Sequence, residues 1–251
     1  MTRRTRLAFT GLVALLVVVI MAAVIGGLFL FRTAEQYYRD SNAIRLDPLG
    51  LSAFTDIPTP LPGNRRVVFY GDSRAARWPA PIVDGFTFIN RGMEGQTSAQ
   101  VAGRFDAHIR PLQPNILLVQ MCVNDLKTIP LFPERQDEII ADCLTHTRQV
   151  VAQARDMGAT VIVTTVFPVG VPSLERRLFF WSVDIAKAVD TVNAALHDLA
   201  GEGVYVLDTY TILADDSGLT RPAYAADTLH LNPAGYAALN VALVELLKSC
   251  P

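Results

Sequence analysis

The chain has 251 residues and a formal net charge of −2, with 22 Lys and Arg against 24 Asp and Glu. Four of the arginines flank one apolar segment near the N-terminus; without them the chain has 18 basic residues and a net charge of −6. An acidic balance without a basic stripe argues against a nucleic-acid partner. The roughly 220 residues after the apolar segment are enough for one sizeable domain with its own core.

Residues 7–31 carry no charged side chain. As a helix this segment would be roughly 37 Å long, enough to span a bilayer with some tilt. Its flanking basic residues are Arg3, Arg4 and Arg6 on one side and Arg32 on the other. This asymmetry predicts that residues 1–6 are cytoplasmic and that the rest of the chain lies outside the cytoplasm. The alternative is a cleaved signal peptide, whose apolar region would be about 7–15 residues long. Because the apolar run continues to Phe31, we favour an uncleaved anchor.

Residues 32–65 have the composition of a linker, since the stretch from Asp56 to Asn64 is rich in proline and other turn formers. The folded domain is then expected to span residues 66–251. Its cysteines are Cys122, Cys143 and Cys250, an odd number whose spacing matches no zinc motif. An oxidising compartment would permit one disulfide, but we expect buried or free thiols.

Five short, mostly apolar runs rich in β-branched and aromatic residues predict buried strands. They are Arg66–Tyr70, Phe86–Asn90, Asn115–Met121, Thr160–Phe167 and Val204–Leu207. Helical patterns occupy Ser98–Arg110, Glu134–Met157, Asp184–Leu199 and Pro233–Leu247. This alternation predicts a three-layer α/β/α sandwich around a parallel five-stranded sheet. In such sheets the active site lies beyond the carboxyl ends of the strands.

Residues that could form a hydrolytic site follow these strand ends. Ser73 follows the first strand and Asn124 the third, while Asp227 and His230 stand three apart before the last helix. A serine hydroxyl needs an imidazole to take its proton, and the imidazole needs a group that fixes its tautomer. Each residue alone has an ordinary explanation, such as a helix cap or a surface histidine. Their joint occurrence at one sheet edge predicts an enzyme.

In this order the segments resemble the four sequence blocks of the SGNH/GDSL hydrolase superfamily, from residue 66 to roughly 248. The matching segments are Gly71–Ser73, Asn90–Thr97, Val123–Asp125 and Asp227–Pro233. The resemblance implies a flavodoxin-like fold and hydrolysis of esters or O-acyl groups without a metal or other cofactor. It places the nucleophile at Ser73, with His230 as general base and Asp227 orienting it. It assigns the oxyanion to the backbone N–H groups of Ser73 and Gly95 and to the side-chain amide of Asn124.

Two residues depart from the family pattern. The leucine that usually follows the nucleophile is Arg74, and the glycine two residues before the third-block asparagine is Cys122. The second change is expected to tighten the space beside Asn124. Arg74 and Arg77 could meet an anionic substrate, but we favour solvated side chains or pairing with Glu94.

The segment Pro172–Val183 follows the fourth strand and contains several aromatic residues, Phe179, Phe180 and Trp181. It is either a lid whose aromatic rings contact a lipid or glycan, or a loop whose rings pack into the core. The leading functional hypothesis is a membrane-anchored serine esterase that removes small acyl groups, acetyl above all, from envelope carbohydrate. An acyltransferase with the same residues is the second. A non-catalytic binding module is the third, and it would have no chemical need for all five site residues.

Overall fold

The computed structural model describes residues 3–58 and 63–250, without the side chains of Ala8 and Phe179. Residues 1–2, 59–62 and 251 lie outside the described part, and with them part of the predicted cytoplasmic segment and of the predicted linker. The chain divides into two compact units, residues 1–50 and 51–251.

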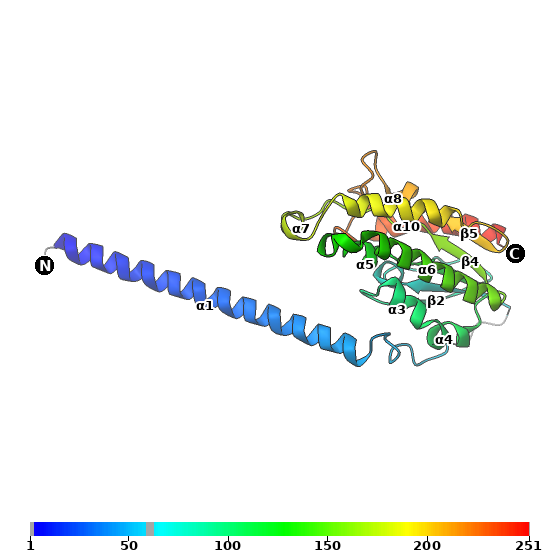
Figure 1. Ribbon diagram of the computed structural model, residues 1–251, viewed down its shortest axis with the longest axis horizontal. Coiled ribbons are helices and arrows are strands. Elements are labelled where there is room, and N and C mark those ends of the chain that lie inside the picture. Colours follow the sequence, from blue (N-terminus) through cyan, green and yellow to red (C-terminus); the bar gives the residue numbers. More distant parts are fainter. Residues whose placement is uncertain (1–2, 59–62, 251) are drawn as a thin grey trace. The chain divides into compact units, whose positions relative to one another are not determined.

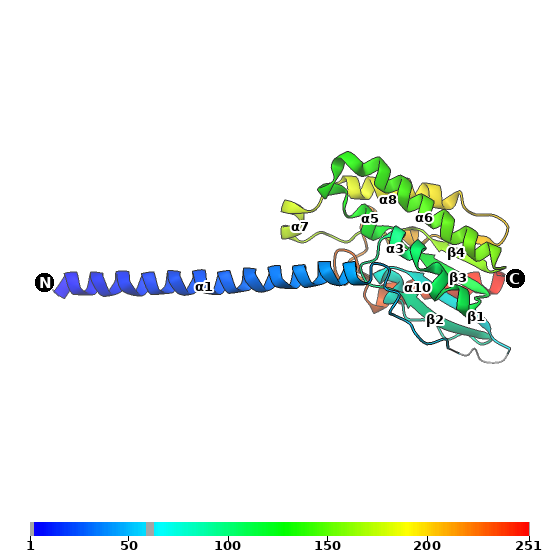
Figure 2. The ribbon, with the colours of Figure 1, turned by 60° about the horizontal axis from the view of Figure 1, so that its bottom comes forward.

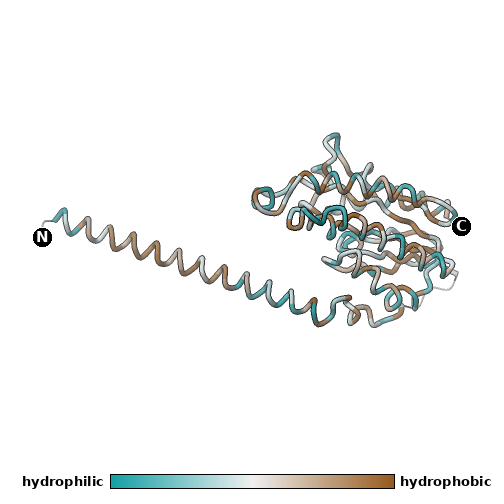
Figure 3. Tube along the Cα trace, viewed as in Figure 1, coloured by the Kyte–Doolittle hydropathy of each residue, from teal (hydrophilic) through white to brown (hydrophobic). Residues whose placement is uncertain are grey.

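The first unit consists of one helix, α1, which runs from Arg3 to Leu46 (Figure 1). Figure 3 shows the apolar composition of its membrane-length part. Within the described residues it is the one helix long and apolar enough to cross a bilayer, a property that an anchor and a signal sequence share. The helix continues past Phe31 to Leu46, so residues 32–46, predicted as part of a linker, are helical. No proline or glycine interrupts this stretch, and Arg39 pairs with Glu35 one turn earlier at 2.8 Å.

The second unit is built on a parallel sheet of five strands, as predicted. They are β1 Arg65–Gly71, β2 Phe86–Gly92, β3 Ile116–Gln120, β4 Thr160–Thr164 and β5 Val204–Leu207. Their order in the sheet is β2-β1-β3-β4-β5, and each neighbouring pair is parallel. Because β1 lies inside the sheet and the chain passes from β2 across it to β3, the ends of β1, β2 and β3 lie side by side.

Helices and short turns connect the strands. The α-helices are α2 Ser73–Ala76, α3 Ser98–Gly103, α4 Phe105–His108, α5 Val123–Leu126, α6 Gln136–Asp156, α7 Leu174–Phe179, α8 Asp184–His197, α9 Thr209–Leu213 and α10 Pro233–Ser249. Three 3-10 turns cover Arg110–Leu112, Ile129–Leu131 and Pro133–Arg135. The predicted helix over Ser98–Arg110 is divided into α3 and α4 at Arg104, whose side chain is buried.

Alternating strand residues supply two cores, one on each face of the sheet. Val68 and Leu117 belong to the core with residues of α3, α6 and α8. Val67 and Leu118 belong to the core with residues of α9 and α10. Figures 1 and 2 show α3, α6 and α8 together on one side of the sheet and α10 on the other. The predicted three-layer α/β/α sandwich is therefore confirmed.

The segment before the sheet, predicted as linker, packs on the domain at residues 51–57. The Phe54 ring lies edge-on to His108 at 5.4 Å, and the Arg91 guanidinium lies 4.7 Å from the centre of the same ring. Arg91 also donates a hydrogen bond of 2.8 Å to the backbone oxygen of Asp56. These contacts make residues 51–57 part of the domain.

Cys122 and Cys143 form a disulfide that joins the start of α5 to α6, and Cys250 is free and buried. The expectation of free thiols was therefore wrong for this pair, because packing of α5 against α6 brings together two residues 21 apart in sequence. Cys122 has φ +88°, in the left-handed region that favours glycine. A glycine at this position would adopt the positive φ without strain. Cys122 adopts the same conformation while its side chain forms the disulfide with Cys143.

Removing the disulfide should destabilise the domain by an amount that depends on the residue left at position 122. We expect Cys122→Ala with Cys143→Ala to lower the free energy of unfolding by about 3 kcal/mol, because the crosslink no longer restricts the unfolded chain. Cys122→Gly with Cys143→Ala should lose about 1 kcal/mol less, since glycine adopts a positive φ without a steric penalty. Urea unfolding of the full chain in neutral detergent micelles, followed by near-UV circular dichroism, measures both. Equal stability of the two variants would contradict a cost of the left-handed conformation.

Candidate active site

The proposed nucleophile lies at a sharp turn between β1 and α2. Gly71 precedes the turn, and a Cβ there would lie 1.6 Å from the backbone oxygen of Gln120, so no other residue fits. Asp72 caps α2, and its side chain accepts the backbone N–H of Arg74 at 2.9 Å. Ser73 is the first residue of α2, where the backbone N–H has no partner within the helix. This N–H is one of the predicted oxyanion donors.

The loop before α10 places a histidine against the serine. His230 Nε2 lies 3.0 Å from Ser73 Oγ, and Asp227 Oδ2 lies 2.8 Å from His230 Nδ1. Asp227 Oδ1 also accepts the backbone N–H groups of Leu229 and His230, at 2.7 and 2.9 Å. Burial raises the pKa of Asp227, but these hydrogen bonds outweigh it and lower the pKa overall. The ionised carboxylate thus stays in place to hold the imidazole.

The other predicted oxyanion donors, Gly95 and Asn124, follow β2 and β3, the two strands that flank β1 in the sheet. Gly95 has φ +73°, and a Cβ added there would meet no atom within 4 Å, so the left-handed conformation, and not a lack of space, favours glycine. Asn124 lies in α5 and is buried; its Nδ2 donates to the backbone oxygen of Gln96 at 2.9 Å. An amide nitrogen carries two protons, so a second donor remains for an oxyanion.

Arg104, which was not identified from the sequence, contacts both the segment that holds Asn124 and the turn that carries Ser73. Its side chain is fully buried, donates to the side-chain oxygen of Gln96, and donates to the backbone oxygen of Gly71 at 2.9 Å. The guanidinium lies 4.4 Å from the centre of the Tyr70 ring, and burial lowers the pKa of Arg104 to about 10. Arg104 therefore fixes Gln96, and through it Asn124, relative to the turn that carries Ser73.

Arg74 does not face a substrate, which corrects both sequence-based interpretations of this residue. The side chain is fully buried and donates three hydrogen bonds to backbone oxygens, to Leu229 at 2.8 Å, Phe167 at 3.0 Å and Pro168 at 3.4 Å. It thus ties α2 to the residue that precedes His230. The solvent-exposed pairing expected for these arginines holds for Arg77, whose Nε lies 2.8 Å from Glu94.

Asp72 is a buried carboxyl group beside the nucleophile. Burial raises its pKa to about 7, against the lowering effect of the Arg74 charge and backbone N–H. Its Oδ2 has no hydrogen-bond partner among the described residues. The resemblance predicts no metal here, and the described residues include no group of three His, Cys, Asp or Glu side chains placed to hold one.

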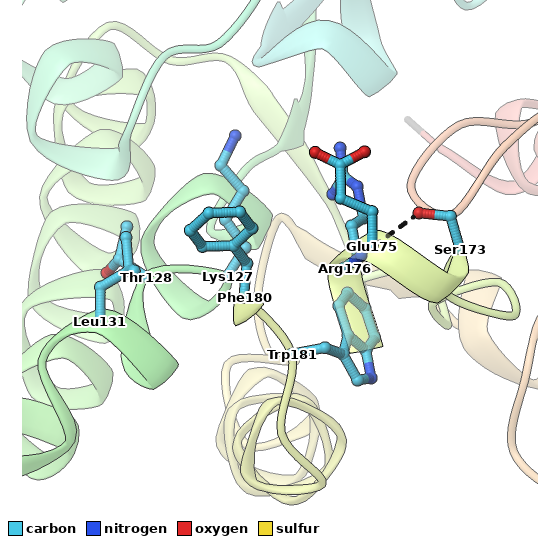
Figure 4. A pocket seen from close by; sticks show the side chains of 8 residues that line it. All are labelled: Lys127, Thr128, Leu131, Ser173, Glu175, Arg176, Phe180 and Trp181. Carbon is cyan, nitrogen blue, oxygen red and sulfur yellow. Dashed lines mark hydrogen bonds between the residues drawn. The ribbon is translucent and has the colours of Figure 1, made fainter. Parts of the chain in front are cut away.

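The segment Pro172–Val183 after β4 combines the two predicted arrangements, a lid with exposed aromatic rings and a loop whose rings pack into the core. Trp181 packs against the first core and also lines a cavity of about 390 Å³, while Phe180 lines the same cavity and is half exposed (Figure 4). The side chain of Phe179 lies outside the described part. The cavity reaches Lys127, whose Nζ donates to Asn124 Oδ1 at 2.6 Å. The sequence analysis did not identify Lys127. Its spacing of three residues from Asn124 could have indicated it, because such residues share one face of a helix.

A sequence profile of the GDSL-like lipase/acylhydrolase family matches residues 59–238. The chain belongs to this family. No curated protein matches the sequence. Among solved structures, the domain is similar to a GDSL-like lipase from Bacteroides thetaiotaomicron, with 18% identity, a TM-score of 0.64, and 81% of this chain and 99% of that chain covered. A variant of an acetyl xylan esterase from Geobacillus stearothermophilus is similar with 16% identity, a TM-score of 0.54, and coverage of 73% and 94%.

As a family member, the protein is an ester-hydrolysing enzyme, and the prediction of an SGNH/GDSL hydrolase is confirmed. All five residues predicted for the site fall within the matched range. The structural neighbours support the same fold, since both align over nearly their whole length.

Arg74→Lys should impair ester hydrolysis by disturbing the position of His230. Lysine keeps the charge but cannot reach three carbonyl oxygens at once, so the 227–230 loop loses its anchor. We expect kcat to fall at least about tenfold with little change in KM, because small displacements of catalytic groups are costly. The measurement is steady-state hydrolysis of p-nitrophenyl acetate by the full chain in neutral detergent micelles. Arg77→Lys, in the exposed pair with Glu94, is the control, and equal kcat values for the two variants would contradict a positioning role.

Proposed function

We propose that the protein is a serine esterase that removes small O-acyl groups, acetyl above all, from carbohydrate at the cell envelope. Ser73 is the nucleophile, His230 the general base and Asp227 the group that orients it. The observation that carries this proposal is the continuous contact from Ser73 Oγ through the imidazole to the Asp227 carboxylate, at 3.0 and 2.8 Å. These are the distances that a nucleophile and its base require.

The reaction proceeds in two halves. Ser73 Oγ attacks the ester carbonyl while His230 Nε2 takes its proton, and Asp227 stabilises the imidazolium. The backbone N–H groups of Ser73 and Gly95 and the Asn124 amide donate to the negative oxygen of the tetrahedral intermediate. His230 returns the proton to the departing alkoxide, which leaves an acyl group on Ser73. Water, deprotonated by His230, then attacks the acyl carbonyl; the bond to Ser73 Oγ breaks, the acid leaves, and His230 returns the proton to Oγ. An alcohol in place of water would give acyl transfer.

Three observations support the substrate class and the location. One structural neighbour is an acetyl xylan esterase, whose substrate is an O-acetylated carbohydrate. Helix α1 is long and apolar enough to be an uncleaved anchor, and the arginines at its start, before the apolar segment 7–31, favour an extracytoplasmic domain. The disulfide between Cys122 and Cys143 fits an oxidising compartment. Together they favour acetylated envelope glycans over cytoplasmic esters.

Ser73→Ala should abolish hydrolysis of short esters. With the full chain in neutral detergent micelles, we expect p-nitrophenyl acetate to be preferred over butyrate and octanoate, and the variant to lose about 10⁴-fold in kcat. A fluorophosphonate probe should label the wild type and not the variant. An added alcohol acceptor reveals transfer as an acetylated product. Equal rates with and without Ser73 would rule out the serine mechanism.

Asn124→Ala should be almost as harmful, because the amide acts on charge that develops only in the transition state. We expect kcat to fall about 10²–10³-fold with KM nearly unchanged. Asn64→Ala is a matched control. The Asn64 amide also donates to a backbone oxygen, that of Phe86, but Phe86 lies at the start of β2, at the sheet edge away from Ser73. A loss confined to KM in Asn124→Ala would be evidence against an oxyanion role.

A further inference from the structure

The cavity of about 390 Å³ lies beside the oxyanion side of the proposed site. Lys127, Thr128 and Leu131 form one wall, and α7 with the residues around it forms the other. Lys127 connects the cavity to the site, because it lines the cavity and its Nζ contacts Asn124 Oδ1 at 2.6 Å. A substrate group held in this cavity would therefore lie next to the amide that we assign to the oxyanion.

Positive charge dominates the cavity lining. Lys127 and Arg176 both line it, and the lining residues include one carboxylate, that of Glu175. Figure 4 shows the charged ends of these three side chains on one side of the view and the Trp181 indole on the other. Burial, and after it the charge of Arg176, lowers the pKa of Lys127. The two cations are thus near enough to repel each other.

Neither cation forms a close ion pair with a described residue, although the charges of Asp72 and Asp125 act to raise the pKa of Lys127. In the described part of the chain, no ion pair within 4.0 Å involves Lys127 or Arg176, although surface residues such as Lys187 and Lys248 are each paired with an acid three residues away. Two unpaired cations beside a cavity are destabilising when the cavity holds only water, because each disfavours the charged form of the other. A bound anion would relieve this repulsion.

We propose that this cavity binds an anionic group of the substrate, such as a carboxylate, through Lys127 and Arg176. This inference rests on the proposed esterase function and adds to it that the ester is negatively charged. Phe180 and Trp181 supply an apolar wall against which the carbon skeleton of the substrate packs. The anion belongs either to the acyl portion or to the alcohol portion of the ester, and the experiment separates the two.

The competing explanation is that Lys127 serves only to orient the Asn124 amide. Such a role would affect neutral and anionic esters in equal proportion. Arg176 separates the two explanations, because its side chain lines the cavity and makes no hydrogen bond to Asn124 in the described structure. The decisive quantity is therefore the ratio of kcat/KM for an anionic ester to that for its neutral counterpart.

The test uses two matched ester pairs with the full chain in neutral detergent micelles. The p-nitrophenyl monoester of adipic acid against p-nitrophenyl hexanoate places the charge on the acyl side. Para-acetoxybenzoate against its methyl ester places the charge on the alcohol side. In one of these pairs we expect Arg176→Gln to lower the anionic-to-neutral ratio about fivefold, the effect of losing one partly exposed ion pair. Differences in intrinsic ester reactivity cancel when wild type and variant are compared.

Two further variants act as controls on α7. Arg177→Gln removes the same charge one residue further on, outside the cavity lining, and should change the ratio less than about twofold. Glu175→Gln removes the cavity carboxylate and should raise the ratio about twofold. Lys127→Met should lower the ratio and also slow the neutral ester, because it contacts Asn124.

If the neutral esters are hydrolysed and Arg176→Gln leaves the anionic-to-neutral ratio of kcat/KM unchanged in both pairs, the inference is overturned. The esterase proposal stands in that case. If no ester is hydrolysed, the esterase proposal fails instead. Calorimetric binding of the same four esters to Ser73→Ala, with and without Arg176→Gln, then decides the inference. Tighter binding of an anionic ester that depends on Arg176 supports it, and equal Kd values overturn it.

Discussion

The site depends on a buried guanidinium. Arg74 directly follows Ser73, the proposed nucleophile, and its three hydrogen bonds reach the backbone after β4 and the residue before His230. Taking a charge out of water is costly, and burial lowers the pKa of Arg74 to about 10. The protein offsets this cost with carbonyl oxygens and with the Phe167 ring, 5.1 Å from the guanidinium. These contacts help to hold His230 at hydrogen-bond distance from Ser73, together with the Asp227 side chain, which accepts the backbone N–H of His230.

The oxyanion side is supported in a similar way by a second buried guanidinium. Arg104 holds Gln96, Gln96 holds the Asn124 amide nitrogen, and Lys127 holds the amide oxygen. With both ends of its amide engaged, Asn124 keeps one orientation, which a preorganised donor requires. The Cys122–Cys143 disulfide fixes the backbone just before this residue. The proposed base and the proposed oxyanion donor Asn124 are thus anchored separately to the same turn, through Arg74 and Gly71.

The strands and the order of the site segments could be predicted because they follow local rules. Apolar β-branched runs such as Val204–Leu207 identify buried strands, and parallel strands bring the residues that follow them to one edge. The roles of Arg74 and Arg104 could not be predicted, since an arginine in a sequence carries no sign of being buried; only the carbonyl oxygens that tertiary packing gathers around it decide that. The same holds for the disulfide, whose two residues meet through the packing of α5 and α6.

The choice of partners for these arginines has an electrostatic consequence. An ion pair with a carboxylate would cancel the positive charge that each guanidinium adds near Ser73, whereas a carbonyl oxygen satisfies its donors and leaves the charge in place. Asp72, a buried acid that interacts with both arginines, has a pKa raised to about 7 by burial and so carries only part of a charge at neutral pH. Arg74, Arg104 and Lys127 therefore contribute a positive potential at the sheet edge where the oxyanion is proposed to form, against the negative contribution of Asp227. Such a potential lowers the energy of a tetrahedral anion more than that of a neutral ester, which is the difference that accelerates a reaction.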